Sequence, residues 1–332
     1  MTTNDMPARS SAWMGRNVLV TGASGMIGSW LVRELLTLGG NVVALVRDAD
    51  PQSELYRSHD IQRVRVVSGS LEEIRTLERA IAENGVDTIF HLGAQTLVTV
   101  ARRSPLQTFE SNIRGTYNLL EACRSHRDLV LRIVVASSDK AYGEQTNLPY
   151  TEEMALEGRQ PYEVSKSCAD MLSQCFWTTY ELPVAVARCG NVYGGGDLNW
   201  SRIVPGTIRS CLLGERPLIR SDGSYVRDYT YVKDVVAGYI KLGEHMNDPQ
   251  VAGKAFNFSA ESPLSVLDLV RTIQRLLECE ELEPQIENTA EGEIHSQYLR
   301  AERARVLLQW EARHSLELAL GETIGWYRDF LL

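Results

Sequence analysis

The chain has 332 residues, of which 44% are hydrophobic and 23% charged, as in a soluble globular protein with a sizeable core. Its net charge of −9 argues against nucleic acid or an anionic membrane as the main partner, and no apolar run approaches the ~20 residues of a membrane span. The six cysteines and six histidines show no metal-ligand spacing, and residues 1–13 lack the layout of a signal peptide. We therefore expect a cytoplasmic protein without a metal site.

The first half of the chain alternates apolar strands with helical segments. Helical spacing of apolar residues predicts helices between the strands, the clearest being 71–83 and 161–180, with another ending near Ser125. Continuous apolar strands separated by helices are typical of a parallel sheet that is covered on both faces, so we expect a Rossmann-type, doubly wound α/β fold. The predicted strands are residues 17–21, 41–46, 64–69, 87–90, 131–137 and 183–188.

After about residue 190 the alternation stops. We expect a helix in "IVPGTIRSCLLGERP", a strand edge followed by a helix in "DYTYVKDVVAGYIKLGEHM", and two or three helices in the last 70 residues. This pattern predicts a cofactor-binding domain over 15–190 and a smaller C-terminal α/β substrate lobe over 191–330, with segments that cross back. A ligand would then lie between the two, at the carboxyl ends of the strands.

A glycine-rich loop follows the first strand. "VTGASGMIGSW" places Gly22, Gly25 and Gly28 where a strand ends and a helix begins. Glycines allow a tight turn and a close approach of the backbone to a pyrophosphate, and the helix N-terminus attracts phosphate. The alternative is a purely structural turn, but the strand-before, helix-after context favours dinucleotide binding. The residues that would contact the cofactor here are Gly22, Ser24, Gly25, Met26, Ile27 and Gly28.

The end of the second strand bears on the choice of cofactor. An acid there binds the adenosine ribose of NAD, whereas an arginine accommodates the 2′-phosphate of NADP. The sequence "ALVRDAD" offers both Arg47 and Asp48. NAD is expected, NADP stays open because of Arg47, and the alternative is that both side chains are merely solvated.

A tyrosine and a lysine follow the fifth strand. Tyr162 and Lys166 in "QPYEVSKSCAD" are four residues apart, so a helix places them on one face. An ammonium close to a phenol lowers the pKa of the phenol and makes it a plausible base. The alternative is a surface tyrosine beside a solvated lysine.

Together these motifs resemble the extended short-chain dehydrogenase/reductase family over roughly residues 15 to 328. The motifs are TGASGMIG, FHLGAQ, Ser138, the Tyr162–Lys166 pair, NVYGGGD and RDYTYVKD. The resemblance implies that Ser138 and Tyr162 bind a hydroxyl to be oxidised, and that Lys166 holds the nicotinamide ribose. It also implies that Leu92, Gly93 and Ala94 adjoin the cofactor. The residues that would contact a nucleotide-hexose substrate are Gln95, Ser138, Asn191, Arg202, Arg227 and Tyr298. Gln297 and Tyr298 could reach the nucleotide, and packing at a helix start is the equal alternative for both.

Asp139 and Lys140 directly follow Ser138 in "VVASSDKAYG". This pair is similar to the CDP-glucose branch of the sugar-nucleotide 4,6-dehydratases, lyases that oxidise C4, eliminate water across C5–C6 and return the hydride to C6. Elimination needs two proton-transfer groups beside the oxidised carbon. The 4-epimerases of the family need only Ser, Tyr and Lys, and a dinucleotide-binding regulator would need none of these groups. Both remain alternatives.

The role of Lys140 and the oligomeric state stay open at this point. Lysine has an unperturbed pKa of about 10.4, so Lys140 serves either as the C5 base or as a stabiliser of the enolate. The resemblance implies a homodimer formed through the helices at 106–125 and 161–180, although the apolar stripe of the latter could face its own sheet. We expect His91 to be a packing residue.

Overall fold

The computed structural model describes residues 11–289 and 292–332, so the first ten residues of the predicted N-terminal tail lie outside the description. Seven parallel strands form the main sheet in the order β10-β6-β5-β4-β1-β2-β3. The order reverses between β1 and β4, where a doubly wound sheet opens a crevice at the carboxyl ends of its strands. The strands are β1 (Asn17–Thr21), β2 (Asn41–Val46), β3 (Arg65–Ser68), β4 (Thr88–His91), β5 (Arg132–Ala136), β6 (Val184–Cys189) and β10 (Ala255–Phe258).

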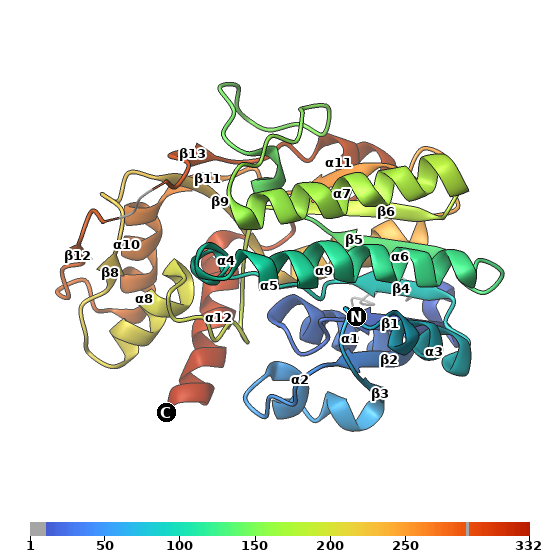
Figure 1. Ribbon diagram of the computed structural model, residues 1–332. Coiled ribbons are helices and arrows are strands. Elements are labelled where there is room, and N and C mark those ends of the chain that lie inside the picture. Colours follow the sequence, from blue (N-terminus) through green and yellow to red (C-terminus); the bar gives the residue numbers. More distant parts are fainter. Residues whose placement is uncertain (1–10, 290–291) are drawn as a thin grey trace, which may run out of the picture.

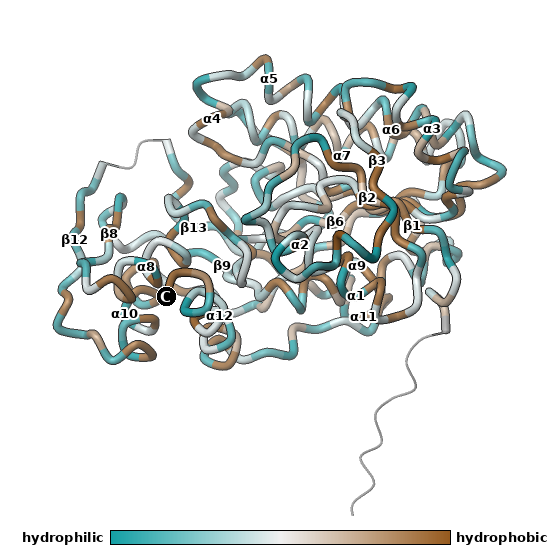
Figure 2. Tube along the Cα trace, turned by 90° about the horizontal axis from the view of Figure 1, so that it is seen from below, coloured by the Kyte–Doolittle hydropathy of each residue, from teal (hydrophilic) through white to brown (hydrophobic). Residues whose placement is uncertain are grey.

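Helices cover both faces of this sheet, as the sequence predicts, and each face has its own apolar core. Figure 1 shows α6 and α7 side by side on one face, and Figure 2 shows that the strands β1 and β2 are apolar. One face carries α3 (Ile74–Asn84), α6 (Gly115–Ser125) and α7 (Pro161–Tyr180), and the other α1 (Met26–Thr37), α9 (Val232–Glu244) and α11 (Glu302–Leu308). Shorter connecting elements are η1 (Ser11–Trp13), α2 (Glu54–Arg57), η2 (Asp60–Arg63), α4 (Val98–Arg103), α5 (Pro105–Phe109), η3 (Glu110–Arg114) and η4 (Asp139–Tyr142).

All six strands predicted for the first half are present: the first two have the predicted bounds, and the ends of the other four differ by one residue. Strand β10, the four-residue edge strand "AFNF" that pairs with β6, was not predicted. A run this short lies among polar and glycine residues, so periodicity gives no signal for it.

The second lobe has a separate apolar core around Tyr193, Tyr229 and Tyr327. Its three long helices agree with the predicted ones, and β9 contains the strand edge expected in "DYTYVKD", but its other short strands were not expected. The chain crosses back to the main sheet through α9, β10 and α11. The lobe consists of β7 (Asn191–Tyr193), α8 (Ile203–Leu212), β8 (Leu218–Ile219), β9 (Val226–Tyr231), β11 (Pro263–Ser265), α10 (Val266–Leu277), β12 (Gln285–Ile286), β13 (Ser296–Gln297) and α12 (Leu316–Leu331).

A buried ion pair fastens α7 to the sheet. Arg188 on β6 donates two hydrogen bonds to the carboxylate of Asp170 on α7, at 2.7 and 2.9 Å. A third bond, of 2.8 Å, runs from Arg188 to the hydroxyl of Tyr142, which donates to Asn257 on β10. The network therefore ties α7, β6, β10 and the turn after β5 together.

Candidate active site

A cleft of about 640 Å³ opens at the carboxyl ends of the strands, between the sheet and the second lobe. Both lobes line it: the first through the loops after β1, β2, β4 and β5, the second through β7 and the start of α8. The predicted site residues that line it are Gly22, Ser24, Gly25, Met26, Ile27, Gly28, Arg47, Asp48, Leu92, Gly93, Ala94, Ser138, Asp139, Lys140, Tyr162, Lys166, Asn191 and Arg202.

Two glycines of the loop after β1 have no room for a side chain. Gly22 adopts a φ of +69°, and a Cβ there would lie 2.7 Å from the backbone nitrogen of Gly93. A Cβ on Gly28 would lie 2.0 Å from the carbonyl oxygen of Gly22. Helix α1 begins at Met26 without a side-chain cap, so its first N–H groups are available to a ligand. This geometry fits the pyrophosphate of a dinucleotide.

Arg47 and Asp48 lie at the end of β2, on the rim of the cleft. Nε of Arg47 lies 2.6 Å from Oδ2 of Asp48, and both side chains are exposed. Their mutual pairing does not by itself distinguish the ribose of NAD from the 2′-phosphate of NADP.

The turn after β5 brings Ser138, Asp139 and Lys140 together. The Ser138 hydroxyl donates to Oδ1 of Asp139 at 2.9 Å and accepts a hydrogen bond from the backbone N–H of Lys140 at 3.2 Å. Ser138 thereby caps η4, and Ser138 and Asp139 are buried. Both side chains are therefore shielded from solvent at the end of β5.

The amine of Lys140 contacts a residue far away in the sequence. Its Nζ donates a hydrogen bond to Oε1 of Gln297 on β13. The pKa of Lys140 is lowered chiefly by burial, while the Asp139 carboxylate opposes the shift and Arg227 adds to it. Burial thus favours the neutral amine that a base requires.

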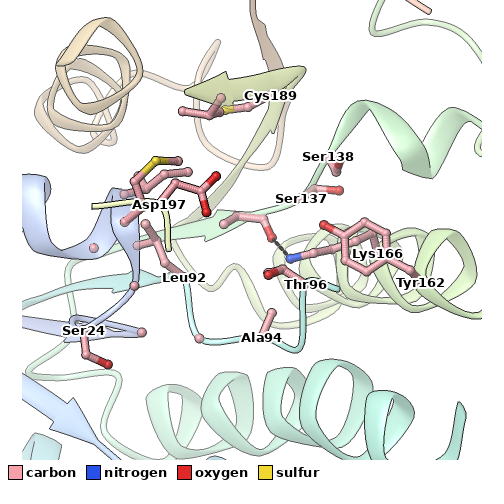
Figure 3. Close-up of a pocket in the computed structure, with 18 of the residues that line it drawn as sticks. Ser24, Leu92, Ala94, Thr96, Ser137, Ser138, Tyr162, Lys166, Cys189 and Asp197 are labelled. Carbon is pink, nitrogen blue, oxygen red and sulfur yellow. Dashed lines mark hydrogen bonds between the residues drawn. The ribbon is translucent and has the colours of Figure 1, made fainter. Parts of the chain in front are cut away.

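Tyr162 stands in the first turn of α7, which starts at Pro161 with a capping box between Gln160 and Glu163. Figure 3 shows Tyr162 beside Lys166, with Ser138 nearby. Burial raises the pKa of Tyr162 to about 12, against the smaller, opposite effects of Arg202 and of a hydrogen bond with Ser138. The expected lowering of the Tyr162 pKa by a nearby cation is therefore not seen in the chain alone, because burial outweighs the opposing effect of Arg202.

Lys166 instead faces the backbone of β5. Its Nζ donates to the carbonyl oxygen of Ala136 at 2.8 Å, the dashed line in Figure 3. Burial lowers the pKa of Lys166 to about 8. The contact directs the amine into the cleft at the end of β5, beside Ser138.

His91 supports the loop that borders the glycines. Thr116 donates its hydroxyl proton to the carbonyl of Asn112, so it accepts from Nε2 of His91 at 3.0 Å. Nδ1 is then an acceptor for the hydroxyl of Thr21, at 2.8 Å, and Thr21 accepts from the N–H of Gly93. Burial lowers the pKa of His91 to about 3, so the ring stays neutral. The expected packing role is accompanied by a hydrogen-bond chain that the sequence did not reveal.

Three predicted substrate residues are not among those that line the cleft. Gln95 is bound to Asn112 through its backbone and folds its side chain onto the N–H of Leu97. Arg227 is buried and donates to the carbonyl oxygens of residues 294 and 295. Tyr298 is half-buried, and its carbonyl accepts from the N–H of Tyr150.

Two further predicted substrate residues, besides Ser138, line the cleft from the second lobe. Asn191 belongs to β7, and Arg202 pairs with Asp197 at 2.9 Å. Sequence reasoning assigned no role to Asp197, or to Ser137 and Thr96, which also line the cleft. The signals that could have found them are adjacency to Ser138 and Gln95 for Ser137 and Thr96, and the NVYGGGD motif for Asp197.

No helix within residues 11–289 and 292–332 is both long and apolar enough to cross a membrane. Within the same ranges, no three His, Cys, Asp or Glu side chains gather as ligands for a metal ion. The six cysteines are free thiols.

Comparison with known proteins agrees with this site. Residues 18–258 match the NAD dependent epimerase/dehydratase family. The chain belongs to this family. One relative in the family is the CDP-glucose 4,6-dehydratase of Salmonella typhimurium, 28% identical over 96% of this chain and 92% of its own length.

Solved structures of epimerases and dehydratases resemble the fold about equally. The UDP-glucose 4-epimerase of Thermotoga maritima, solved with UDP-glucose, has a TM-score of 0.87, 28% identity and coverage of 95% of this chain and 100% of its own. The dTDP-glucose 4,6-dehydratase of Bacillus anthracis, solved with NAD, has a TM-score of 0.84, 25% identity and coverage of 95% and 97%. The family and the Rossmann-type fold predicted from the sequence are thus confirmed, whereas the substrate is not decided by likeness.

Proposed function

We propose that this protein is a nucleotide-sugar 4,6-dehydratase that acts on CDP-glucose. The observation that carries the proposal is the pair Asp139 and Lys140, which line the cleft directly beside Ser138. A 4-epimerase has no use for two further proton-transfer groups at that place, whereas elimination of water requires them. The likeness to a CDP-glucose 4,6-dehydratase supports the choice of nucleotide.

The first step would take place between Ser138 and Tyr162. Their hydroxyls would hold the C4 hydroxyl of the hexose, and Tyr162 would accept its proton. Bound NAD would supply a positive charge that favours the phenolate, and the site that accepts the C4 hydride and returns it to C6. Lys166 would hold the nicotinamide ribose from the end of β5.

The elimination would fall to the next two residues. Once C4 is a ketone, the C5 proton is acidic, and Lys140 would take it or stabilise the enolate that forms. The electron pair of the C5–H bond becomes the C5–C6 double bond as the C6–O bond breaks. Asp139 would protonate the departing oxygen, which leaves as water. The hydride then returns to C6, and a proton returns to C5, giving the 4-keto-6-deoxy sugar.

The second lobe would hold the nucleotide sugar and residues 15–190 the cofactor. Asn191 and Arg202 are supported as substrate contacts by their place on the cleft wall. Arg227 could reach a diphosphate only if it released the carbonyls of residues 294 and 295. Gln95 and Tyr298 likewise remain predicted substrate contacts. Each would need a local rearrangement to reach the cleft.

A nucleotide-sugar 4-epimerase is the second candidate. It is favoured by the likeness to the Thermotoga maritima enzyme and by the presence of Ser138, Tyr162 and Lys166, which suffice for epimerisation. Under this reading Asp139 and Lys140 would be structural.

Incubation of the purified protein with CDP-, dTDP-, UDP- and GDP-hexoses, followed by mass spectrometry, separates these readings. We expect the CDP-glucose product to be lighter by one water. Water loss from another nucleotide alone would keep the reaction and discard CDP-glucose, and an isomer of unchanged mass would favour the epimerase.

We further propose a cytoplasmic homodimer. Free cysteines suit a reducing compartment. The helices named for pairing expose Leu106 (71%), Tyr117 (41%) and Met171 (52%), a run of apolar side chains that a second copy could cover. Light scattering on the wild type and on a Tyr117→Glu, Met171→Glu variant tests this: we expect a dimer and a monomer, and a monomeric wild type would refute it.

A further inference from the structure

Gln297 reaches from the second lobe to the catalytic turn. It is fully buried on β13, where it pairs in register with Arg227 of β9. Its Oε1 accepts the hydrogen bond from Lys140, and its Nε2 donates to the backbone carbonyl of Asp139 at 2.9 Å. One amide therefore contacts both residues of the proposed elimination pair, across 157 positions of the sequence in the case of Lys140.

The two contacts determine the orientation of this amide. An ammonium has donors only and a carbonyl is an acceptor only, so the amide oxygen must face Lys140 and the amide nitrogen must face Asp139. A glutamate in the same place would meet the carbonyl of Asp139 with a second acceptor. A leucine would satisfy neither partner. Glutamine is thus the one of these three similar-sized residues that satisfies both contacts.

The lack of charge on the Gln297 amide matters for the protonation of Lys140 as much as the position of the amide does. Around Lys140 lie Asp139 on its own turn, Arg227 on β9, Glu293 in the loop before β13 and Glu163 on α7. The three acids favour the ammonium, whereas Arg227 and burial disfavour it. The group that accepts the hydrogen bond from Nζ, however, is uncharged. It fixes the amine without adding a charge that would hold the proton on it.

We propose that Gln297 is a positioning residue for the dehydration, one that holds Lys140 and the Asp139 turn through a neutral contact and so leaves the Lys140 amine able to take up and release a proton. The reaction that it serves rests on the proposed function. The contact itself, and its effect on the protonation of Lys140, do not depend on which sugar nucleotide is the substrate.

The test reads the protonation of Lys140 without turnover. Trace acetylation of the native protein with acetic anhydride, measured at Lys140 by peptide mass spectrometry across pH 6 to 11, gives the pKa of this amine. We expect Gln297→Glu to raise it by about one unit or more, because a carboxylate at hydrogen-bond distance stabilises the ammonium. Gln285→Glu, which adds the same charge at an exposed position on β12, should leave it unchanged.

A kinetic readout completes the test. Gln297→Leu should lower kcat for water loss by about tenfold or more with little change in KM, as expected for a residue that orients a proton-transfer group. Gln297→Asn, one methylene shorter, should fall short of one of its two partners and restore only part of kcat. Circular dichroism and thermal unfolding identify any variant that fails to fold.

The proposal is overturned if folded Gln297→Glu titrates like the wild type at Lys140. If that variant does not fold, a folded Gln297→Leu with wild-type kcat overturns it instead. Failure of the proposed function looks different: no sugar nucleotide would lose water, yet the change in Lys140 titration would persist.

Discussion

The two halves of the cleft are built by different means. In the cofactor half, the loop around Gly22 and Gly28 offers backbone N–H groups, and a Cβ on either glycine would collide with a neighbouring backbone atom. In the substrate half, Asp139 and Lys140 are held by side-chain contacts that reach to Gln297 on a distant strand. A backbone-built site is encoded in a few adjacent residues, whereas a side-chain-built site depends on how remote segments meet.

This contrast predicts opposite sensitivities. In the cofactor half, adding a methyl group to a glycine should weaken NAD binding. In the substrate half, removing or neutralising one side chain should slow water loss even when the volume of the side chain is kept.

The largest effect is expected in the substrate half, at Asp139 and Lys140. Asp139→Asn and Lys140→Met should each slow water loss by about 10²–10⁴-fold, the usual contribution of a proton-transfer group. Oxidation at C4 should survive, seen as absorbance of reduced cofactor. The matched control is Glu144→Gln, an exposed acid after the same turn. Full water loss in Asp139→Asn would show that the acid lies elsewhere.

The next effect concerns the buried ion pair between Arg188 and Asp170, which fastens α7 to the sheet. Arg188→Met should lower the free energy of unfolding by about 3–5 kcal/mol, because it leaves Asp170 buried without its partner. Combining it with Asp170→Leu should recover most of this loss. Urea unfolding measures both variants, and Arg79→Met, which removes an exposed pair with Glu83, should cost at most about 1 kcal/mol. Equal losses at Arg79 and Arg188 would contradict this account.

In the cofactor half, Gly28→Ala should weaken NAD binding. Its new Cβ would lie 2.0 Å from the Gly22 carbonyl, and relieving such overpacking costs about 1–3 kcal/mol, or roughly fivefold to over a hundredfold in affinity. Calorimetry checks the affinity. Gly321→Ala, on α12 with open space around its Cβ, serves as the control and should bind NAD like the wild type. Wild-type affinity in Gly28→Ala would refute the backbone-built site.

The smallest effect, counted per pH unit, is a pH dependence from His91, which supports the loop that borders the glycines. His91 has its pKa lowered from 6.5 to about 3, so between these values only the unfolded chain binds the extra proton. Stability should therefore fall as pH drops from 6.5 to 3, by up to about 1.4 kcal/mol per pH unit. His91→Gln should flatten this slope in urea unfolding, and the exposed His295→Gln should not. Identical slopes in wild type and His91→Gln would contradict the argument.

The same contrast explains what the sequence could predict. The six strands of the first half, the glycine turn and helix α7 follow from local patterns, because continuous apolar runs, glycine spacing and the proline at the start of α7 act over a few residues. The edge strand β10 was missed because its four residues carry no period.

Within the site, adjacency in sequence was again the signal. Ser138, Asp139 and Lys140 are consecutive, and Tyr162 and Lys166 share a helix, so they could be named in advance. The role of Gln297 and the burial of Arg227 behind residues 294 and 295 depend on the pairing of β13 with β9, which no local pattern indicates. The raised pKa of Tyr162 likewise comes from burial in the folded cleft.

The most direct test of the central claim follows a label through one turnover. CDP-glucose that carries deuterium at C4 is incubated with the protein and NAD, and the product is examined by mass spectrometry and NMR. Our account predicts loss of one water and transfer of the deuterium to C6, as a CH₂D group. Deuterium retained at C4 in an isomer of unchanged mass would contradict it, because the hydride would then have returned to the carbon it left.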